Sequence, residues 1–272
     1  MIYRTIQGSR VPALGFGTYQ ITGPSCRNAV ADALNIGYRH IDTAQIYRNE
    51  AEVGEAISGS GIPREDIFLT TKVWLDNLAP ADVHSSTRES LRKLQTDYVD
   101  LLLIHWPNES AAPLEETLDA LDELKNAGHT RHIGVSNFTP SMVERAVNHT
   151  TIFCNQVEYH PLLAQETLLK LAREHGMLLT AYSPIARGKV LESSTLQQIG
   201  STHGKSPVQV ALRWLLQQEN VAAIPKAESA DHRRSNFDVF DFELSDEEMQ
   251  RIDQMQAGKR LVNPGFAPAW EK

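Results

Sequence analysis

The stretch VDLLLIHWPNESAAPLEETLDALDELKNAGHTRHIGV, residues 99–135, contains one complete structural unit of this chain. Its first six residues are almost continuously apolar, which is typical of a strand buried on both faces. After Pro113, leucines recur at positions 114, 118, 121 and 124, the spacing of one helix face, and Gly128 is a helix stop. The apolar run at 130–135 then predicts another strand. The stretch therefore predicts a strand, a helix and a following strand.

The same unit recurs along the chain. We expect strands at 14–17, 38–42, 67–72, 99–104, 130–135, 152–156, 177–182 and 221–225. Among the intervening helices, one begins at Ser25 and stops at Gly37, a second opens with a capping box of Asn49 and Glu52, and others span 114–127, 165–175 and 208–218. A doubly wound open sheet shows the same alternation, but eight even units favour a (β/α)8 barrel.

The two ends of the chain add to this α/β barrel. An N-terminal hairpin is expected from strands at 3–6 and 11–14 around a turn at 7–9, and an extra helix at 243–256 precedes a short tail at 258–272. No linker or low-complexity stretch interrupts the pattern. We therefore expect residues 1–272 to form a single domain.

Composition excludes several classes of protein. Hydrophobic residues make up 41% and charged residues 22% of the 272 residues, which are ordinary globular values. The net charge of -8 argues against a nucleic-acid partner. No apolar run approaches the roughly 18–20 residues of a membrane span, and the N-terminus does not resemble a signal peptide. Cys26 and Cys154 are too few for a disulfide framework or a zinc site. We expect a cytoplasmic enzyme without membrane partners.

Polar residues stand where the predicted strands end, and in a barrel these ends meet at one mouth. The residues concerned are Asp42, Lys72, His105, Ser136, Asn137, Gln156, Tyr182, Ser183 and Lys226, with Tyr47 in the loop behind Asp42. Each residue alone has an ordinary structural explanation, such as a turn residue or a solvated edge. Their convergence on one ring favours a site.

Four of these residues suit proton transfer to an oxygen. A phenol has a pKa of about 10, and an adjacent ammonium lowers it, so Lys72 is expected to lower the pKa of Tyr47. Asp42 would keep Lys72 charged, and His105 can donate a hydrogen bond to a substrate oxygen. His40, Asp42 and His105 imitate a metal-ligand set, but we expect no metal. No nucleophile elbow and no Rossmann glycine spacing occur.

Longer motifs carry a family resemblance. They are GYRHIDTA at 37–44, YRNE at 47–50, TTKVW at 70–74, YVDLLLIHWP at 98–107, IGVSNF at 133–138 and IPK at 224–226. With them the chain resembles the aldo-keto reductase family from its hairpin to its last helix. The short tail and Arg260-Leu261-Val262 are most similar to bacterial members that reduce 2,5-diketo-gluconate or methylglyoxal.

The resemblance implies a TIM barrel that reduces aldehydes and ketones with NADPH. Tyr47 would be the general acid, Lys72 and Asp42 the pair that tunes it, and His105 the group that orients the carbonyl. The pocket walls would be Tyr19, Trp74 and Trp106, with the segment around Trp270 folding over. Small polar carbonyls, keto-sugars or 2-oxoaldehydes would fit such an open mouth, and the enzyme would be a monomer.

The resemblance also implies a set of cofactor-binding residues. Tyr182 would stack on the nicotinamide, the loop 183–189 would cover the pyrophosphate, and Lys226 would reach the adenosine ribose phosphate. The full set is Gly17, Thr18, Asp42, Ser136, Asn137, Gln156, Tyr182, Ser183, Pro184, Ile185, Arg187, Gly188, Lys189, Ile224, Pro225, Lys226, His232 and Asn236.

The chain departs from the family after Lys226. Relatives commonly have a Ser next and an Arg six positions beyond the Lys, but here these positions are Ala227 and His232. Histidine is mostly neutral at pH 7 and lacks the planar fork of arginine. Arg233 and Arg234 follow and could substitute through a shifted helix start. The departure predicts that NADPH is preferred less strongly than in relatives, with some use of NADH.

Two other functions use the same residues. A Schiff-base lyase or aldolase on a barrel would use Lys72 as its nucleophile. A redox sensor or regulatory subunit would keep the cofactor site without turnover. The presence of all four residues suited to proton transfer favours the enzyme over the sensor.

Overall fold

A computed structural model describes residues 1–255 and 257–271. Its main sheet has eight parallel strands in chain order. They are β3 (Phe16–Gly17), β4 (His40–Asp42), β5 (Phe68–Val73), β6 (Val99–Ile104), β7 (Thr130–Ser136), β8 (Cys154–Glu158), β9 (Leu178–Tyr182) and β10 (Val221–Ala223). The N–H of Gly15 donates to the carbonyl of Ala223 at 2.8 Å, and the N–H of Ala223 donates to Ala13 at 2.8 Å. These bonds close the sheet, so the predicted (β/α)8 barrel is confirmed.

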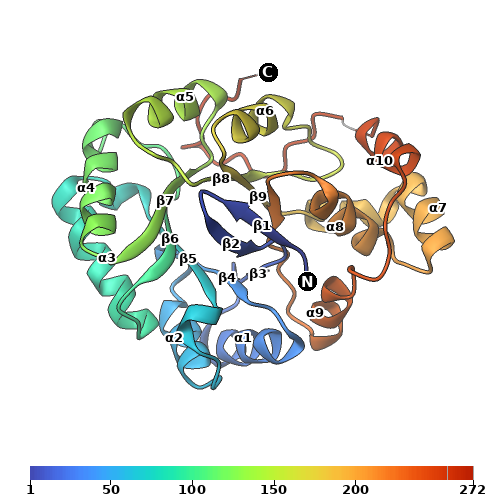
Figure 1. The fold of residues 1–272 in the computed structure, drawn as a ribbon, viewed down its shortest axis with the longest axis horizontal. Coiled ribbons are helices and arrows are strands. Elements are labelled where there is room, and N and C mark those ends of the chain that lie inside the picture. Colours follow the sequence, from blue (N-terminus) through green and yellow to red (C-terminus); the bar gives the residue numbers. More distant parts are fainter. Residues whose placement is uncertain (256, 272) are drawn as a thin grey trace.

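Helices form a ring outside the strands (Figure 1). They are α1 (Gly23–Ile36), α2 (Glu50–Ser58), α3 (Pro80–Leu94), α4 (Leu114–Asn126), α5 (Pro140–His149), α6 (Glu166–Glu174), α7 (Ser194–His203), α8 (Pro207–Gln217), α9 (Ala230–Phe237) and α10 (Asp246–Asp253). In α4 the predicted leucine stripe is buried against the barrel, which confirms its helical spacing. All six residues of β6 are buried, as a strand covered on both faces requires.

The N-terminal hairpin covers one end of the barrel, and Figure 1 looks onto it. It pairs β1 (Tyr3–Ile6) with β2 (Ser9–Pro12). Gln7 and Gly8 both have positive φ, 46° and 80°, which is the geometry of a two-residue type I′ turn. The predicted three-residue turn and second strand at 11–14 are therefore wrong in detail. Leu14 instead forms a bridge with Ala223 and helps to close the barrel.

One predicted helix start and one predicted capping box are wrong, although α2 does begin directly after Asn49, as predicted. Helix α1 begins at Gly23 instead of Ser25, because Pro24 occupies its first turn, where a missing N–H is tolerated. The capping box at Asn49 does not form. The side chain of Asn49 is buried and donates to the carbonyls of Thr18 at 2.9 Å and Ile21 at 2.8 Å. These tertiary contacts hold the loop after β3 in place of capping α2.

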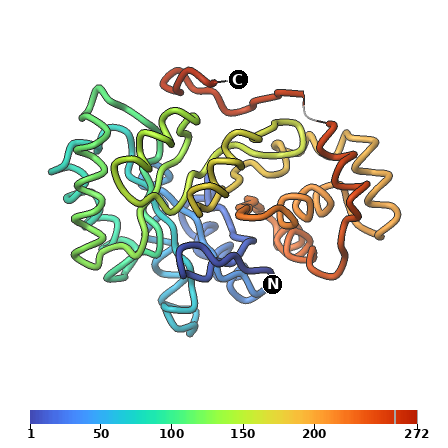
Figure 2. Tube along the Cα trace, turned by 45° about the horizontal axis from the view of Figure 1, so that its top comes forward, coloured from blue at the N-terminus to red at the C-terminus, as the bar shows by residue number. Residues whose placement is uncertain are grey.

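The predicted C-terminal helix at 243–256 is shorter in the structure. Ser245 caps α10 in a capping box with Glu248, so the helix begins at Asp246. The predicted end at Gln256 and the last residue, Lys272, lie outside the described residues. From Gly258 the tail runs across the barrel face opposite the hairpin, and Figure 2 shows it at the top, with the N-terminus below. None of the described helices is long and apolar enough to cross a membrane.

Candidate active site

A cavity of about 730 Å³ opens at the carboxyl ends of the strands. Loops after the strands and the C-terminal tail form its wall. The wall comprises Gly17, Tyr19, Gln20, Asp42, Ile46, Tyr47, Trp74, His105, Trp106, Asn137, Gln156, Tyr182, Ser183, Pro184, Ile185, Arg187, Ile224, Lys226, Leu261, Val262, Asn263, Pro264 and Phe266. Most of the residues predicted from the strand ends therefore share one cavity.

Asp42 and Lys72 form a buried ion pair beneath this cavity. Asp42 is the last residue of β4 and Lys72 the next-to-last residue of the adjacent β5, and Lys72 Nζ lies 2.5 Å from Asp42 Oδ1. Nζ also donates to the carbonyl of Thr43 at 2.9 Å, and Gln156 Nε2 donates to Asp42 Oδ2 at 2.8 Å. Burial lowers the pKa of Lys72, whereas Asp42 opposes this shift by favouring the ammonium. The pair is thus held from three strands.

Tyr47 stands above the ion pair, in the short 3₁₀ turn Gln45–Tyr47 that follows β4. Its Oη lies 3.5 Å from Lys72 Nζ. Burial raises the pKa of Tyr47 well above its ordinary value, and Asp42 adds to the rise. The shift is opposite to the lowering expected from Lys72, because burial is its largest cause. Tyr47 is therefore a protonated phenol at neutral pH.

His105 follows β6, and its ring packs edge-on to that of Tyr47, with ring centroids 5.6 Å apart. Burial lowers its pKa well below the ordinary value, and the charge of Lys72 contributes. The imidazole is therefore neutral. Nδ1 is buried and has no hydrogen-bond partner among the described residues, which leaves Nε2 as the nitrogen available to the cavity. A neutral imidazole next to a phenol can position an oxygen by donating a hydrogen bond.

Aromatic side chains form the walls near His105. Trp74 lies 5.3 Å from the His105 ring, and Phe266 of the tail packs edge-on to both Trp74 and Trp106. Tyr19 is 49% exposed at the rim, with its ring 5.1 Å from that of Tyr47. The three predicted wall residues therefore come together. Trp270 stacks under Arg260 and contacts Trp106, but it is not part of the described cavity wall.

Amide and phenol groups occupy the wall after β7, β8 and β9. Asn137, with φ of 63°, accepts a hydrogen bond from Tyr182 Oη at 2.7 Å on its Oδ1 and donates to the carbonyl of His105 at 2.9 Å. Ser136 Oγ donates to the carbonyl of Gln156 at 2.8 Å and lies behind the wall. These contacts lock the side chains of Asn137 and Tyr182 into one arrangement.

The loop after β9 turns sharply over the cavity. Ser183, Ala186, Arg187 and Gly188 all have positive φ. Ser183, Pro184, Ile185 and Arg187 line the cavity, whereas Gly188 and Lys189 are not part of the described wall. This loop supplies one cation, Arg187, to the wall.

The segment after β10 approaches the start of β3. A Cβ on Gly17 would lie only 2.9 Å from the carbonyl oxygen of Ile224, so barrel closure by itself requires glycine there. Thr18 is fully buried, and its Oγ1 donates to the carbonyl of Asp42 at 3.0 Å. Ile224 and Lys226 line the cavity. The structure leaves Thr18, Pro225, His232 and Asn236 off the described wall, with His232 exposed and Asn236 buried on α9.

Sequence reasoning missed the tail residues of the wall and the residue that holds them. Glu158, fully buried at the end of β8, accepts the backbone N–H of Leu261 at 2.8 Å and of Val262 at 2.9 Å. Burial acts to raise its pKa, but hydrogen bonds from His160 and these two N–H groups hold the pKa below its ordinary value. The sequence signal that could have revealed this contact was a Glu next to a strand that is otherwise expected to be buried.

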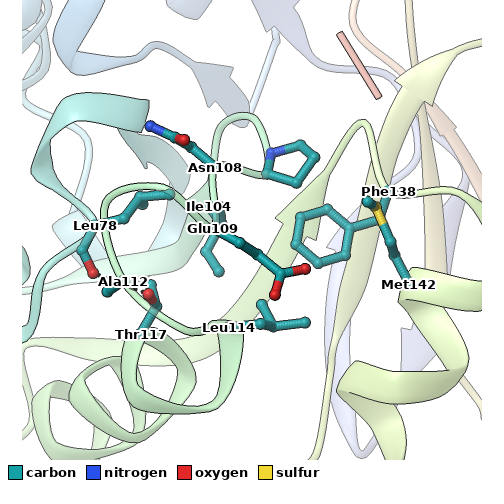
Figure 3. A pocket seen from close by; sticks show the side chains of 10 residues that line it. Leu78, Ile104, Asn108, Glu109, Ala112, Leu114, Thr117, Phe138 and Met142 are labelled. Carbon is teal, nitrogen blue, oxygen red and sulfur yellow. Dashed lines mark hydrogen bonds between the residues drawn. The ribbon is translucent and has the colours of Figure 1, made fainter. Parts of the chain in front are cut away.

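A second, much smaller hollow of about 10 Å³ lies outside the barrel, next to the loop before α4. Figure 3 shows its wall, with Phe138 and Met142 facing Leu78 and Ile104. It shares no residue with the large cavity and holds at most one water-sized molecule. Among the described residues, no cluster of three or more His, Cys, Asp or Glu side chains is placed to hold a metal ion.

A barrel with this cavity and a buried acid–base cluster at its mouth is the framework of a carbonyl-reducing oxidoreductase, and comparison with known proteins agrees. The model of the Aldo/keto reductase family matches residues 13–257, and the chain belongs to that family. It is 42% identical over 266 residues to a methylglyoxal reductase DkgB of Salmonella typhi, covering 96% of this chain and 99% of that one.

Solved structures give the same result. The structure of a 2,5-diketo-D-gluconic acid reductase B matches with a TM-score of 0.97 and 49% identity, covering 100% of this chain and 98% of the other. An aldose reductase from Schistosoma japonicum matches with a TM-score of 0.92 and 32% identity, covering 98% of each chain. The chain is an oxidoreductase of small-molecule carbonyls that works with a nicotinamide cofactor.

Proposed function

We propose that residues 1–272 form one NADPH-dependent reductase domain, which converts small aldehydes and ketones to alcohols with Tyr47 as general acid. One observation carries the proposal. The protonated phenol of Tyr47 lies on the cavity wall 3.5 Å from an ammonium that is itself held by Asp42 at 2.5 Å. In this arrangement the phenol of Tyr47 can donate a proton into the cavity, and the positive charge of Lys72 lies directly behind it.

The wall fits a nicotinamide dinucleotide. The volume of the cavity, about 730 Å³, lies in the usual range for ligand sites. Asn137, Gln156 and Tyr182 offer amide groups and a ring face for the nicotinamide. Arg187 and Lys226, the two Lys or Arg side chains on the described wall, stand after β9 and β10, where they suit phosphates. When bound, the cofactor supplies the hydride that the protein itself lacks.

The chain's own residues would then handle the carbonyl oxygen. His105 Nε2 donates a hydrogen bond that orients the oxygen, and Tyr47 Oη gives it a proton as negative charge develops there. Lys72 stabilises the phenolate left on Tyr47, and Asp42 and Thr43 keep Lys72 in position. In this account Lys72 acts on the phenolate that forms, instead of lowering the resting pKa of the phenol.

The wall also supports a substrate class. Trp74, Trp106 and Phe266 enclose the space beside His105, while Gln20 and Asn263 add polar groups at its edge. A small carbonyl with neighbouring oxygens suits this mixture. The names of the relatives are consistent with 2-oxoaldehydes such as methylglyoxal and with keto-sugar acids as substrates.

The alternative of a Schiff-base enzyme has little support. Lys72 is fully buried, bonded to Asp42 and Thr43, and not part of the described cavity wall. An ammonium held in this way is not a free nucleophile. Treatment with borohydride and a carbonyl substrate is expected to leave Lys72 unlabelled.

The proposal is tested by following oxidation of NADPH over a panel of 2-oxoaldehydes, simple aldehydes and keto-sugars. We expect turnover with several members and the fastest turnover among the small ones. Tight NADPH binding without oxidation by any carbonyl would instead favour a sensor or regulatory role. Monomeric state, cytoplasmic location and lack of nucleic-acid binding stay predictions, and light scattering after size-exclusion chromatography tests the first.

A further inference from the structure

Lys226 is already engaged by a neighbouring carboxylate. Its ammonium donates a hydrogen bond to Glu228 Oε1, two residues further along the chain. The side chain of Lys226 is 32% exposed and lines the cavity, whereas Glu228 is 70% exposed and is not part of the described wall. Lys226 lowers the pKa of Glu228, which is therefore a carboxylate throughout the neutral range.

The arginines of α9 point elsewhere. Arg233 is buried, with Nε 2.7 Å from Asp32 Oδ2, and its Nη1 donates to the carbonyls of Ala227 at 3.2 Å and Glu228 at 2.6 Å. It cannot turn toward Lys226 without leaving these three partners, so the suggested substitution of Arg233 for the missing arginine is not available. Instead, Arg233 fixes the backbone that carries Glu228.

The next arginine is 62% exposed and also lies near carboxylates. Arg234 lies 3.6 Å from Asp231 and 4.0 Å from Asp32, between two carboxylates. Ala227 has no side-chain donor, and His232 offers an imidazole in place of a guanidinium. Lys226 is therefore the cation of this segment that faces the cavity, and its charge is offset by Glu228.

This balance of charge distinguishes two ligands. A phosphomonoester carries close to two negative charges and is repelled by a carboxylate, and it must also displace Glu228 from Lys226. A free ribose hydroxyl donates a hydrogen bond, and an acidic side chain is a good acceptor for it. Glu228 therefore disfavours a 2′-phosphate and favours a 2′-hydroxyl.

We propose that Glu228 is a specificity residue that weakens the preference for NADPH and supports the use of NADH by accepting a hydrogen bond from the adenosine ribose. The inference rests on the proposed function, because it assumes that the dinucleotide extends to Lys226. It goes beyond the absence of an arginine at His232, since it assigns an active, opposing role to a residue that the sequence analysis did not single out.

The test measures binding of four nucleotides to the whole protein by calorimetric titration at fixed ionic strength. The probes are NADPH and 2′,5′-ADP, which carry the 2′-phosphate, and NADH and 5′-ADP, which carry the hydroxyl. Because the two ADP probes lack nicotinamide, they report on this end of the cavity without any turnover.

In Glu228→Gln, NADPH and 2′,5′-ADP should bind about tenfold more tightly, and NADH and 5′-ADP about threefold more weakly. Asp231→Asn is the matched control, since Asp231, three residues further along in the first turn of α9, is a 95% exposed carboxylate that pairs with Arg234 instead of Lys226. It should change each dissociation constant less than twofold. A second pair of variants uses Lys226→Gln, which should weaken 2′,5′-ADP more in the Glu228→Gln background than in the wild type.

The outcomes separate the two hypotheses. If the wild type binds both dinucleotides but Glu228→Gln shifts all four probes alike, or none, the role of Glu228 is wrong and the reductase proposal stands. An equal shift from Asp231→Asn likewise contradicts a specific role. If the wild type binds no dinucleotide, the proposed function fails first, and this inference fails with it.

Discussion

Lys72 Nζ and Asp42 Oδ1 lie 2.5 Å apart inside the barrel, and both side chains are shielded from solvent. Removing one partner of such a pair leaves an uncompensated charge, which costs about 3–5 kcal/mol. We expect Asp42→Asn and Lys72→Met each to lower the free energy of unfolding by this amount. The double variant should lose less than the sum, because it leaves no unpaired charge. Urea unfolding of the four proteins measures the coupling, and additive losses would count against a paired arrangement.

The turnover rates should also show that Lys72 and Asp42 are coupled, but here the loss of Lys72 should have the larger effect. Lys72→Met removes the charge that stabilises the Tyr47 phenolate and should reduce turnover by about 10²–10⁴-fold. Asp42→Asn leaves the ammonium of Lys72 in place and should reduce turnover less. The double variant should be no slower than Lys72→Met by more than a few-fold, because the residues act as one unit. Steady-state rates with NADPH and one aldehyde provide the comparison.

Glu158 should control the C-terminal side of the pocket. In Glu158→Gln one of the two acceptor oxygens becomes an amide that faces the backbone N–H of Leu261 or Val262, so that contact is lost. We expect faster proteolysis of the tail and a KM for carbonyl substrates raised about three- to tenfold, with a smaller change in kcat. Glu271→Gln, which alters the contacts of the tail with Thr139 and Ser141, is the control. Unchanged proteolysis in Glu158→Gln would show that the tail is held elsewhere.

His132 should make stability dependent on pH. Its ring stacks on Phe153 at 3.9 Å, and burial lowers its pKa from 6.5 to about 4. Between these two pH values the imidazole is protonated in the unfolded chain and neutral in the folded chain. The stabilisation that the neutral ring gives to the fold is therefore present above pH 6.5 and is lost as the pH falls toward about 4. Because the ring is partly exposed, we expect the free energy of unfolding to fall by only roughly 1–2 kcal/mol over this pH range.

The measurement compares unfolding of the wild type and His132→Phe between pH 4 and pH 7. The phenyl ring keeps the stack on Phe153 but cannot titrate, so the curve of the variant should be flatter. Ser9→Ala, which removes only the hydrogen-bond partner of Nε2, should retain the slope of the wild type. Parallel curves for the wild type and His132→Phe would contradict the assignment.

His232→Arg tests the departure that the sequence revealed. A guanidinium offers a charged fork to a phosphate, so NADPH should bind more tightly by roughly 1–2 kcal/mol while NADH changes little. Fluorescence titration with both nucleotides at fixed ionic strength checks this. If NADPH binding does not move, or NADH moves equally, His232 does not face the 2′-phosphate.

Much of the site could be predicted because it depends on strand ends. Asp42 and Lys72 lie at the carboxyl ends of β4 and β5, and His105 directly follows β6. Parallel strands in a barrel bring these ends to one face. The leucine spacing of α4 and the strand at 99–104 also needed only local periodicity. These features are set by short stretches of sequence.

Other features depend on contacts between distant segments. Leu261 and Phe266 join the wall because buried Glu158 holds the tail 103 residues further on, and no local pattern encodes this. The side chain of Asn49 was predicted to cap a helix, but it donates hydrogen bonds to the backbone carbonyls of Thr18 and Ile21 instead. The shift in the Tyr47 pKa could not be read from proximity to Lys72, because its sign depends on burial and on the Asp42 pair. The Glu228–Lys226 pair was likewise visible only in three dimensions.

The central claim is that Tyr47 gives its proton to the carbonyl oxygen. The most direct test is Tyr47→Phe, measured in single-turnover reduction with NADPH prebound and in NADPH titration. The account predicts a rate lower by about 10²–10⁴-fold and an NADPH dissociation constant within about threefold of the wild type, since the phenyl ring keeps its packing against Tyr19 and His105. A variant that retains more than about a tenth of the wild-type rate would contradict the claim.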